Sequence, residues 1–135
     1  MVIVDSSVII DLLSGRVTAQ TNWLQRHLEL ERMGITSLIL SEVLQGIRDD
    51  AVFAEALAAL GRFVIFETGG RGLAIDSARN YRALRKRGLT IRSTIDCLTA
   101  TFCINDKHEL LHNDRDFDAF EEHLDLAVVH PETLN

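Results

Sequence analysis

The chain has 135 residues, and its 14 Lys and Arg against 20 Asp and Glu give a net charge of −6 at pH 7. This length predicts a single domain over residues 1–135, and 47% hydrophobic with 25% charged residues is typical of a globular protein and excludes a disordered one. Taken as one number, the negative charge argues against a nucleic-acid partner, because phosphate binding depends on Lys and Arg. The start MVIVD lacks a basic leader region and no uncharged stretch reaches the roughly 20 residues of a membrane span, so we expect a cytoplasmic protein without membrane segments.

The predicted elements alternate between short apolar strands and helices. In chain order we expect a strand at 2–4, a helix from 8 to about 13, a helix at 18–33, a strand at 35–36, helices at 38–45 and 51–60, a strand at 63–66, helices at 72–87 and 94–105, a strand at 110–112, a helix at 116–123 and a strand at 126–129. Ser37, Asp49 and Ser93 are the expected N-caps of three of these helices. Strands without polar alternation, separated by helices, predict an α/β fold: a three-layer α/β/α sandwich around a central, mainly parallel five-stranded sheet.

Carboxylates follow two of the predicted strands. Asp5 ends the first strand, and Asp114 with Asp116 follows the fourth, at the sheet edge where parallel folds bind ligands. Asp96 lies in the first turn of its helix and Glu42 lies inside an apolar helical stretch. Each has a structural alternative: Asp96 favours a helix N-terminus, Asp114 and Asp116 are good turn or cap residues, and Glu42 can face solvent. Asp5 is harder to explain in this way, because a carboxylate at the end of a buried strand is costly without a partner.

Acids that converge on one rim repel one another unless a cation neutralises them. An all-oxygen set of ligands indicates a hard ion, Mg²⁺ or Mn²⁺, which keeps water ligands and binds substrate phosphate. Such a site predicts metal-assisted hydrolysis of phosphodiester bonds.

Four segments carry a resemblance to a known family: VIVDSS at 2–7, SEVLQG at 41–46, IRSTIDCLTA at 91–100 and HNDRDFD at 112–118. In this order and spacing the sequence resembles the PIN-domain ribonucleases, specifically the VapC-type toxins of bacterial and archaeal toxin–antitoxin pairs. The departures are small, since Ser6 stands where Thr is frequent and Thr99 where an aliphatic residue is usual. Neither departure removes a carboxylate.

The resemblance implies a catalytic pocket of Asp5, Glu42, Asp96 and Asp114, with Asp116 as an additional acid and with Asp5, Asp96 and Asp114 as ligands of Mg²⁺ or Mn²⁺. It also implies an endoribonuclease that cuts RNA, often tRNA or rRNA, and leaves a 5′-phosphate. Family members are usually homodimers, and a VapB-type antitoxin inhibits them by wrapping its carboxyl-terminal segment over the pocket in a hetero-oligomer. The apolar stripe Ile9, Leu13, Trp23 and Leu24 is expected in the core, although part of it can line an antitoxin groove.

Supporting roles are expected for several neighbours of the acids. Ser6 and Asn113 can hold a water or orient a carboxylate, and both can equally cap local backbone. Arg92 and Arg115 can contact substrate phosphate or balance the acids in the empty site. His112 is expected to be structural, because a hard ion has no need of imidazole.

The charge is unevenly distributed along the chain. Residues 71–92 hold seven of the 14 basic residues against one acid, for a net charge of +6, while residues 106–125 have a net charge of −6. This basic segment, including Arg85 and Arg87, can guide an RNA backbone to the acids, and the alternative is a solvated helix face. The total charge therefore does not exclude RNA.

Two other functions fit the sequence less well. A phosphoacceptor receiver domain also has acids at strand ends, but it needs an acceptor Asp after the third strand and a Lys after the fifth, where this chain has Glu67-Thr68 and His130-Pro131. A non-catalytic binding module of the same fold is the other alternative, although all the acidic positions are filled.

Overall fold

The computed structural model describes residues 1–132 and contains one five-stranded sheet. The strands are β1 (Val2–Val4), β2 (Gly34–Thr36), β3 (Val64–Phe66), β4 (Glu109–Leu111) and β5 (Ala127–Val128), in the spatial order β3-β2-β1-β4-β5. Every neighbouring pair is parallel. The expected α/β fold is confirmed, with a sheet that is parallel throughout.

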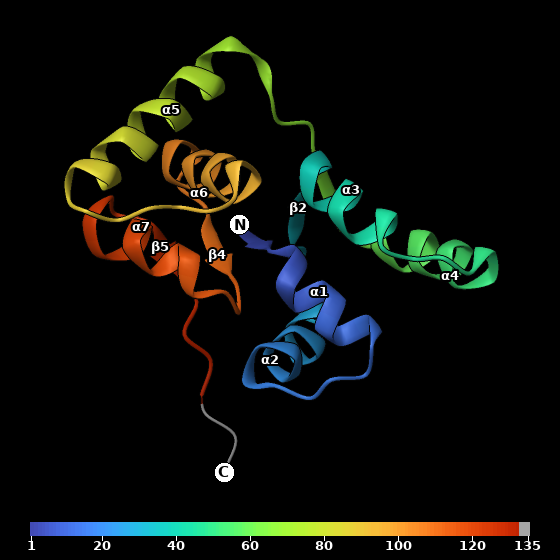
Figure 1. Ribbon diagram of the computed structural model, residues 1–135. Helices are drawn as coiled ribbons and strands as arrows, with labels where there is room; N and C mark the ends of the chain where they lie inside the picture. Colours follow the sequence, from blue (N-terminus) through green and yellow to red (C-terminus); the bar gives the residue numbers. More distant parts are fainter. Residues whose placement is uncertain (133–135) are drawn as a thin grey trace.

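Seven helices and one 3₁₀ turn connect the described strands. They are α1 (Ser6–Leu13), α2 (Ala19–Leu28), α3 (Ser37–Gln45), α4 (Asp50–Leu60), α5 (Gly70–Lys86), α6 (Thr94–Asp106), the 3₁₀ turn η1 (Arg115–Phe117) and α7 (Asp118–His123). Helix α1 packs against α2 and α3, whereas α5 packs against α6 and α7. These two groups flank the sheet, and α4 extends from the body at the end of an arm that begins with α3 (Figure 1).

The strand order reverses direction at β1. The chain passes outward from β1 to β2 and β3, and then crosses back through α5 and α6 to enter β4 on the other side of β1. The backbone N–H of Asp5 donates to the carbonyl of Leu111 at 2.9 Å, which holds the carboxyl ends of β1 and β4 together. Ligand sites of parallel sheets lie at such a switch point.

Side-chain caps fix where most of the helices begin. Asp5, Thr18, Asp49 and Ser93 each accept a hydrogen bond from a backbone N–H in the first turn of the helix that follows. The expected cap Ser37 is wrong, because Thr36 accepts from the Ile39 N–H at 3.1 Å and Ser37 is the first helical residue. Such caps contribute about 1 kcal/mol each and explain why short helices start sharply after strands.

Most predicted boundaries agree with the structure to within two residues, and three of the differences have a clear structural cause or consequence. Helix α2 ends at Leu28, not near residue 33, because the chain must turn through the exposed Leu30 to bring Met33 and Gly34 into the core. The helix expected from residue 116 begins at Asp118, since η1 occupies the preceding positions. Strand β5 is shorter than expected, with two residues.

The core surrounds the central strands. Ile3, Val4, Leu110 and Leu111 are fully buried, and Leu84 of α5 closes the core from the α5–α7 side. Gly34 of β2 is tightly enclosed, because a Cβ there would lie 2.6 Å from the Phe66 ring. Within the described residues no helix is long and apolar enough to cross a membrane.

Candidate active site

Asp5 anchors the site at the end of the central strand. Its side chain is 2% exposed, and Oδ2 accepts from the Ser7 hydroxyl at 2.6 Å and from the Ser7 N–H at 3.0 Å. The other oxygen, Oδ1, is buried and has no hydrogen-bond partner among the described residues. Burial is the largest influence on this group and raises the pKa of Asp5, which the bonds from Ser7 partly oppose. One carboxylate oxygen of Asp5 is therefore buried without a hydrogen bond from the described residues.

Glu42 faces the same region from α3. Its Oε1 accepts from the Ser6 hydroxyl at 3.2 Å, so two consecutive serines serve two different acids. Burial, and then the charge of Asp5, raise the pKa of Glu42. Ser6 thus orients a carboxylate, which is one of the roles expected for it.

Three aspartates come closest to one another. Asp96, Asp114 and Asp116 each offer a carboxylate oxygen within 4.8 Å of the others. Asp96 comes from the first turn of α6, where Ser93 caps its N–H at 3.2 Å, and Asp114 is the N-cap of η1, accepting from the Asp116 N–H at 2.9 Å. The groups expected to bind metal were Asp5, Asp96 and Asp114. The observed group contains two of these with Asp116, and Asp5 lies outside it.

The five acids form one electrostatic unit. The pKa of Asp96 is raised to about 7 by burial first and then by the charges of Asp5, Asp114, Glu42 and Asp116. Mutual repulsion of this kind is relieved by a proton or by a bound cation.

The residues present fit a hard divalent cation. The three clustered donors are all carboxylate oxygens at the switch point of a parallel sheet. Asp5, whose charge acts on Asp96, adds a buried Oδ1 that has no hydrogen-bond partner among the described residues. Mg²⁺ and Mn²⁺ prefer such oxygen ligands.

Polar contacts of Asn113 and His112 hold the loop after β4 in place. The Ser7 hydroxyl accepts from the Asn113 N–H at 3.1 Å, and the Asn113 side chain donates to Asp11 at 3.4 Å. His112 Nδ1 accepts from the Asp114 N–H at 3.1 Å while its ring lies against Phe117. This contact requires an unprotonated Nδ1, and burial lowers the pKa of His112. The expected structural role of His112 fits these contacts.

The four arginines expected to bind substrate lie in different surroundings. Arg92 is paired with Asp116 at 3.4 Å and is 79% exposed. Arg115 lines a cavity of about 270 Å³ together with Asp114. Arg85 lies over the Tyr81 ring, and Arg87 is the exposed C-cap of α5.

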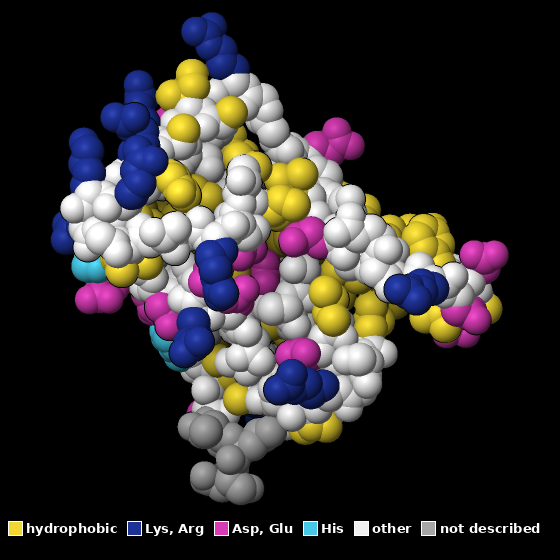
Figure 2. Space-filling view, in the orientation of Figure 1, with side chains coloured by type: hydrophobic (Ala, Val, Ile, Leu, Met, Phe, Trp, Pro, Cys, Tyr) yellow, Lys and Arg dark blue, Asp and Glu magenta, His cyan; other side chains and the backbone are white. Residues whose placement is uncertain are grey.

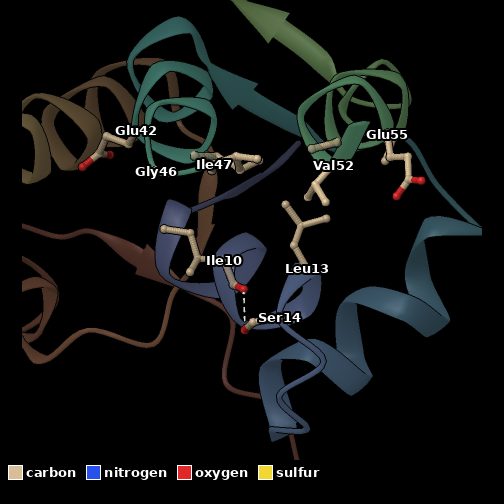
Figure 3. Close-up of a pocket in the computed structure, with 11 residues that line it drawn as sticks. Ile10, Leu13, Ser14, Glu42, Gly46, Ile47, Val52 and Glu55 are labelled. Atoms are coloured by element: carbon tan, nitrogen blue, oxygen red, sulfur yellow. Dashed lines mark hydrogen bonds between the residues drawn. The ribbon is translucent and has the colours of Figure 1, made fainter. Parts of the chain in front are cut away.

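An apolar groove borders the acids between α1, α3 and α4. Its volume is about 440 Å³. Leu13 of α1 faces Val52 of α4 across it, and Ile10 of α1 lies farther toward Glu42 (Figure 3). Glu42 and Glu55 lie at the two ends of the groove (Figure 3). Ile10 and Leu13 are 47% and 44% exposed. Leu13 was expected in the core, with a groove as the alternative for part of its stripe, and it lines a groove.

Comparison with known proteins identifies the fold family. The model of the PIN domain matches residues 2–122. The chain belongs to the PIN-domain family. Two curated relatives, VapC ribonuclease Mb1587 of Mycobacterium bovis and ribonuclease VapC11 of Mycobacterium tuberculosis, are each 30% identical over 127 residues, which cover 87% of this PIN domain and 90% of the relative. The expected family is confirmed, and the receiver-domain alternative is excluded.

Solved structures show the same fold at low identity. VapBC2 from Rickettsia felis bound to a promoter DNA fragment superposes on the PIN domain with a TM-score of 0.77 at 18% identity, covering 98% of this chain and all of that one. VapBC-1 from nontypeable Haemophilus influenzae gives 0.73 at 17% identity, with 96% and 97% covered. Similarity at this level establishes the fold alone.

Proposed function

We propose that this protein is a metal-dependent endoribonuclease toxin of a type II toxin–antitoxin system, acting on RNA in the cytoplasm. The observation that carries the proposal is the set of five acids at the switch point, three of them with oxygens within 4.8 Å, in a PIN domain whose curated relatives are named VapC ribonucleases. The overall negative charge is compatible with this activity, because much of it belongs to the acidic site.

In this proposal Asp96, Asp114 and Asp116 hold Mg²⁺ or Mn²⁺, with Asp5 completing the site from β1. When bound, such an ion neutralises phosphate charge and increases the acidity of water. Glu42 accepts the proton of the attacking water at a carboxylate oxygen, since its raised pKa brings it closer to the pH at which it must act. Ser6 and Ser7 keep Glu42 and Asp5 in position. Arg92 is exposed enough to turn from Asp116 to a substrate phosphate.

Cleavage of RNA by purified protein tests the proposal. The parent should cut structured RNA with Mg²⁺ or Mn²⁺, and a chelator should abolish the activity. Asp5→Asn and Asp96→Asn should each remove it, while Asp106→Asn, an exposed acid at the other end of α6, should retain it. Asn variants of Asp5 and Asp96 that cut as fast as the parent would show that the assigned site is wrong.

We also propose that the groove between α1, α3 and α4 receives a VapB-type antitoxin. An apolar floor with acids at both ends suits an amphipathic helix that carries basic residues near its ends. A helix seated there lies beside Glu42 and restricts access to the acids. In this arrangement the toxin assembles as a homodimer within a hetero-oligomer with its antitoxin.

Binding of the antitoxin encoded beside the protein tests this partner. Leu13→Asp should weaken the complex strongly and leave the free toxin folded and active, because Leu13 is 44% exposed. Val17→Asp, at an exposed apolar residue outside the groove, is the matched control and should bind normally. Equal affinities for the two variants would move the antitoxin to another surface.

A further inference from the structure

A further cavity opens between α5 and α6. It has a volume of about 490 Å³, within the usual range of small-molecule pockets. Small residues of α5, Ala74, Ser77 and Ala78, create the space, and Leu98 of α6 lines the opposite wall. Their positions follow helical spacing, so one face of α5 is hollowed where it passes over α6.

Flat side chains occupy one end of this cavity. Tyr81 follows the small residues along the same face of α5, and the Arg85 guanidinium lies over its ring at 5.6 Å from the centroid. Arg82 also lines the cavity and is exposed. The cavity therefore combines an apolar wall with an aromatic ring that has a guanidinium group over it.

The surface around the cavity is basic. Figure 2 shows Lys and Arg side chains gathered over the outer side of α5, with acidic groups collected below it. The cavity reaches Thr94, two residues before Asp96, and Arg92 follows the loop from α5 and contacts Asp116. The cavity thus reaches the first turn of α6, the same turn that carries Asp96.

We propose that this cavity binds a nucleobase of the RNA substrate, stacked on Tyr81 and Arg85, in a nucleotide that flanks the cleaved bond. The inference rests on the proposed function and adds to it a place where the enzyme contacts a base. Single-stranded RNA is recognised in this way, through unstacked bases held against aromatic rings or Arg guanidinium planes. Arg82 then lies where it can bind an adjacent phosphate. The charge of the surrounding surface favours RNA as the occupant of the cavity, because α5 and the following loop carry a net charge of +6 and RNA is negatively charged.

RNA binding without cleavage tests the proposal. In the Asp96→Asn background, fluorescence anisotropy measures the affinity for a short single-stranded RNA of mixed sequence and for an abasic ribose-phosphate strand of the same length. Tyr81→Leu should weaken binding of the base-containing strand about fivefold to a hundredfold and leave the abasic strand unchanged, in line with about 1–3 kcal/mol for each stacked base. Tyr81→Phe keeps the ring and should restore the affinity.

A charge variant separates stacking from phosphate binding. Arg82→Gln should weaken both strands and reduce the slope of log affinity against log salt by about 0.7, as expected for one lost phosphate contact. Arg62→Gln is the matched control, since Arg62 precedes β3 at the opposite edge of the sheet and pairs with Glu29. It should leave the affinities and the salt slope unchanged.

The outcomes distinguish this inference from the function on which it rests. If the parent cuts RNA but Tyr81→Leu lowers the affinity for both strands equally or for neither, the base pocket is refuted and the nuclease stands. If Tyr81→Leu instead converts a dimer to a monomer and leaves the preference for base-containing RNA intact, the cavity is an interface between two copies, which also refutes it. If the parent neither cuts nor binds RNA, both proposals fail.

Discussion

Replacing Asp96 by Asn should stabilise the metal-free protein above pH 7. Asp96 is 8% exposed, and burial and neighbouring acids raise the pKa of its carboxyl group from 3.8 to about 7. The folded state thus binds the proton more tightly than the unfolded state. The stability that this group contributes is fully present below about pH 4 and is lost as the pH rises through about 7.

The expected size follows from this change in proton affinity. The full shift in the pKa of Asp96 corresponds to about 4 kcal/mol in the free energy of unfolding, at about 1.4 kcal/mol for each tenfold change in proton affinity. Because part of this shift comes from the charges of neighbouring acids, which share the repulsion, we expect a stabilisation of about 2–4 kcal/mol for Asp96→Asn at high pH and little difference near pH 4.

Urea unfolding with a chelator present, repeated across this pH range, measures the effect. The parent should lose stability between about pH 4 and pH 7, while the Asn variant should change less. Asp106→Asn is the control on the same helix, and as an exposed substitution it should stay within about 0.5 kcal/mol of the parent at every pH. Parallel curves for the parent and Asp96→Asn would refute the idea that Asp96 is destabilised by its neighbours.

Three further perturbations test other parts of the structure. Ser7→Ala removes the 2.6 Å hydrogen bond to Asp5 and should cost about 1–3 kcal/mol in urea unfolding; an unchanged midpoint would contradict this. Gly34→Ala places a Cβ 2.6 Å from the Phe66 ring and should cost about 1–3 kcal/mol, whereas Gly46→Ala, whose nearest contact is 3.8 Å, should be nearly neutral; similar losses would refute the packing argument. Mg²⁺ or Mn²⁺ at a hundredfold excess over Kd should stabilise the parent by about 2.7 kcal/mol in thermal unfolding, and an equal gain in Asp96→Asn would place the ion elsewhere.

The sequence predicted the location of the acids because strand topology constrains it. Once Val2–Val4 and Glu109–Leu111 are parallel neighbours, Asp5 and Asp114 must meet at one edge. The cap Ser93 predicts only that Asp96 lies in the first turn of its helix, and the resemblance to PIN-domain ribonucleases is what placed Asp96 and Glu42 in the same pocket. The positions of Asp5 and Asp114 depend on local patterns and on a general property of parallel sheets.

Finer contacts could not be predicted, since they depend on local turns and long-range packing. Asp116 joins Asp96 and Asp114 because η1 turns it back, and the sequence pattern there indicated an ordinary helix instead. Ser6 and Ser7 are adjacent and alike in sequence, yet their hydroxyls serve different acids. The contact between Ser7 and Asp5 had a signal in the sequence, since an N-cap Asp is followed two residues later by Ser.

The pairing of β1 with β4 also bears on when the protein becomes active during its synthesis. Val2 is paired with Glu109, so β1 leaves the ribosome more than a hundred residues before it gains this neighbour. A nascent chain that ends before β4 lacks the pairing of β1 with β4, and it also lacks Asp114. Its Asp5 therefore has no neighbouring acid from the loop after β4. The proposed nuclease is therefore inert until β4 and the loop that carries Asp114 have been synthesised.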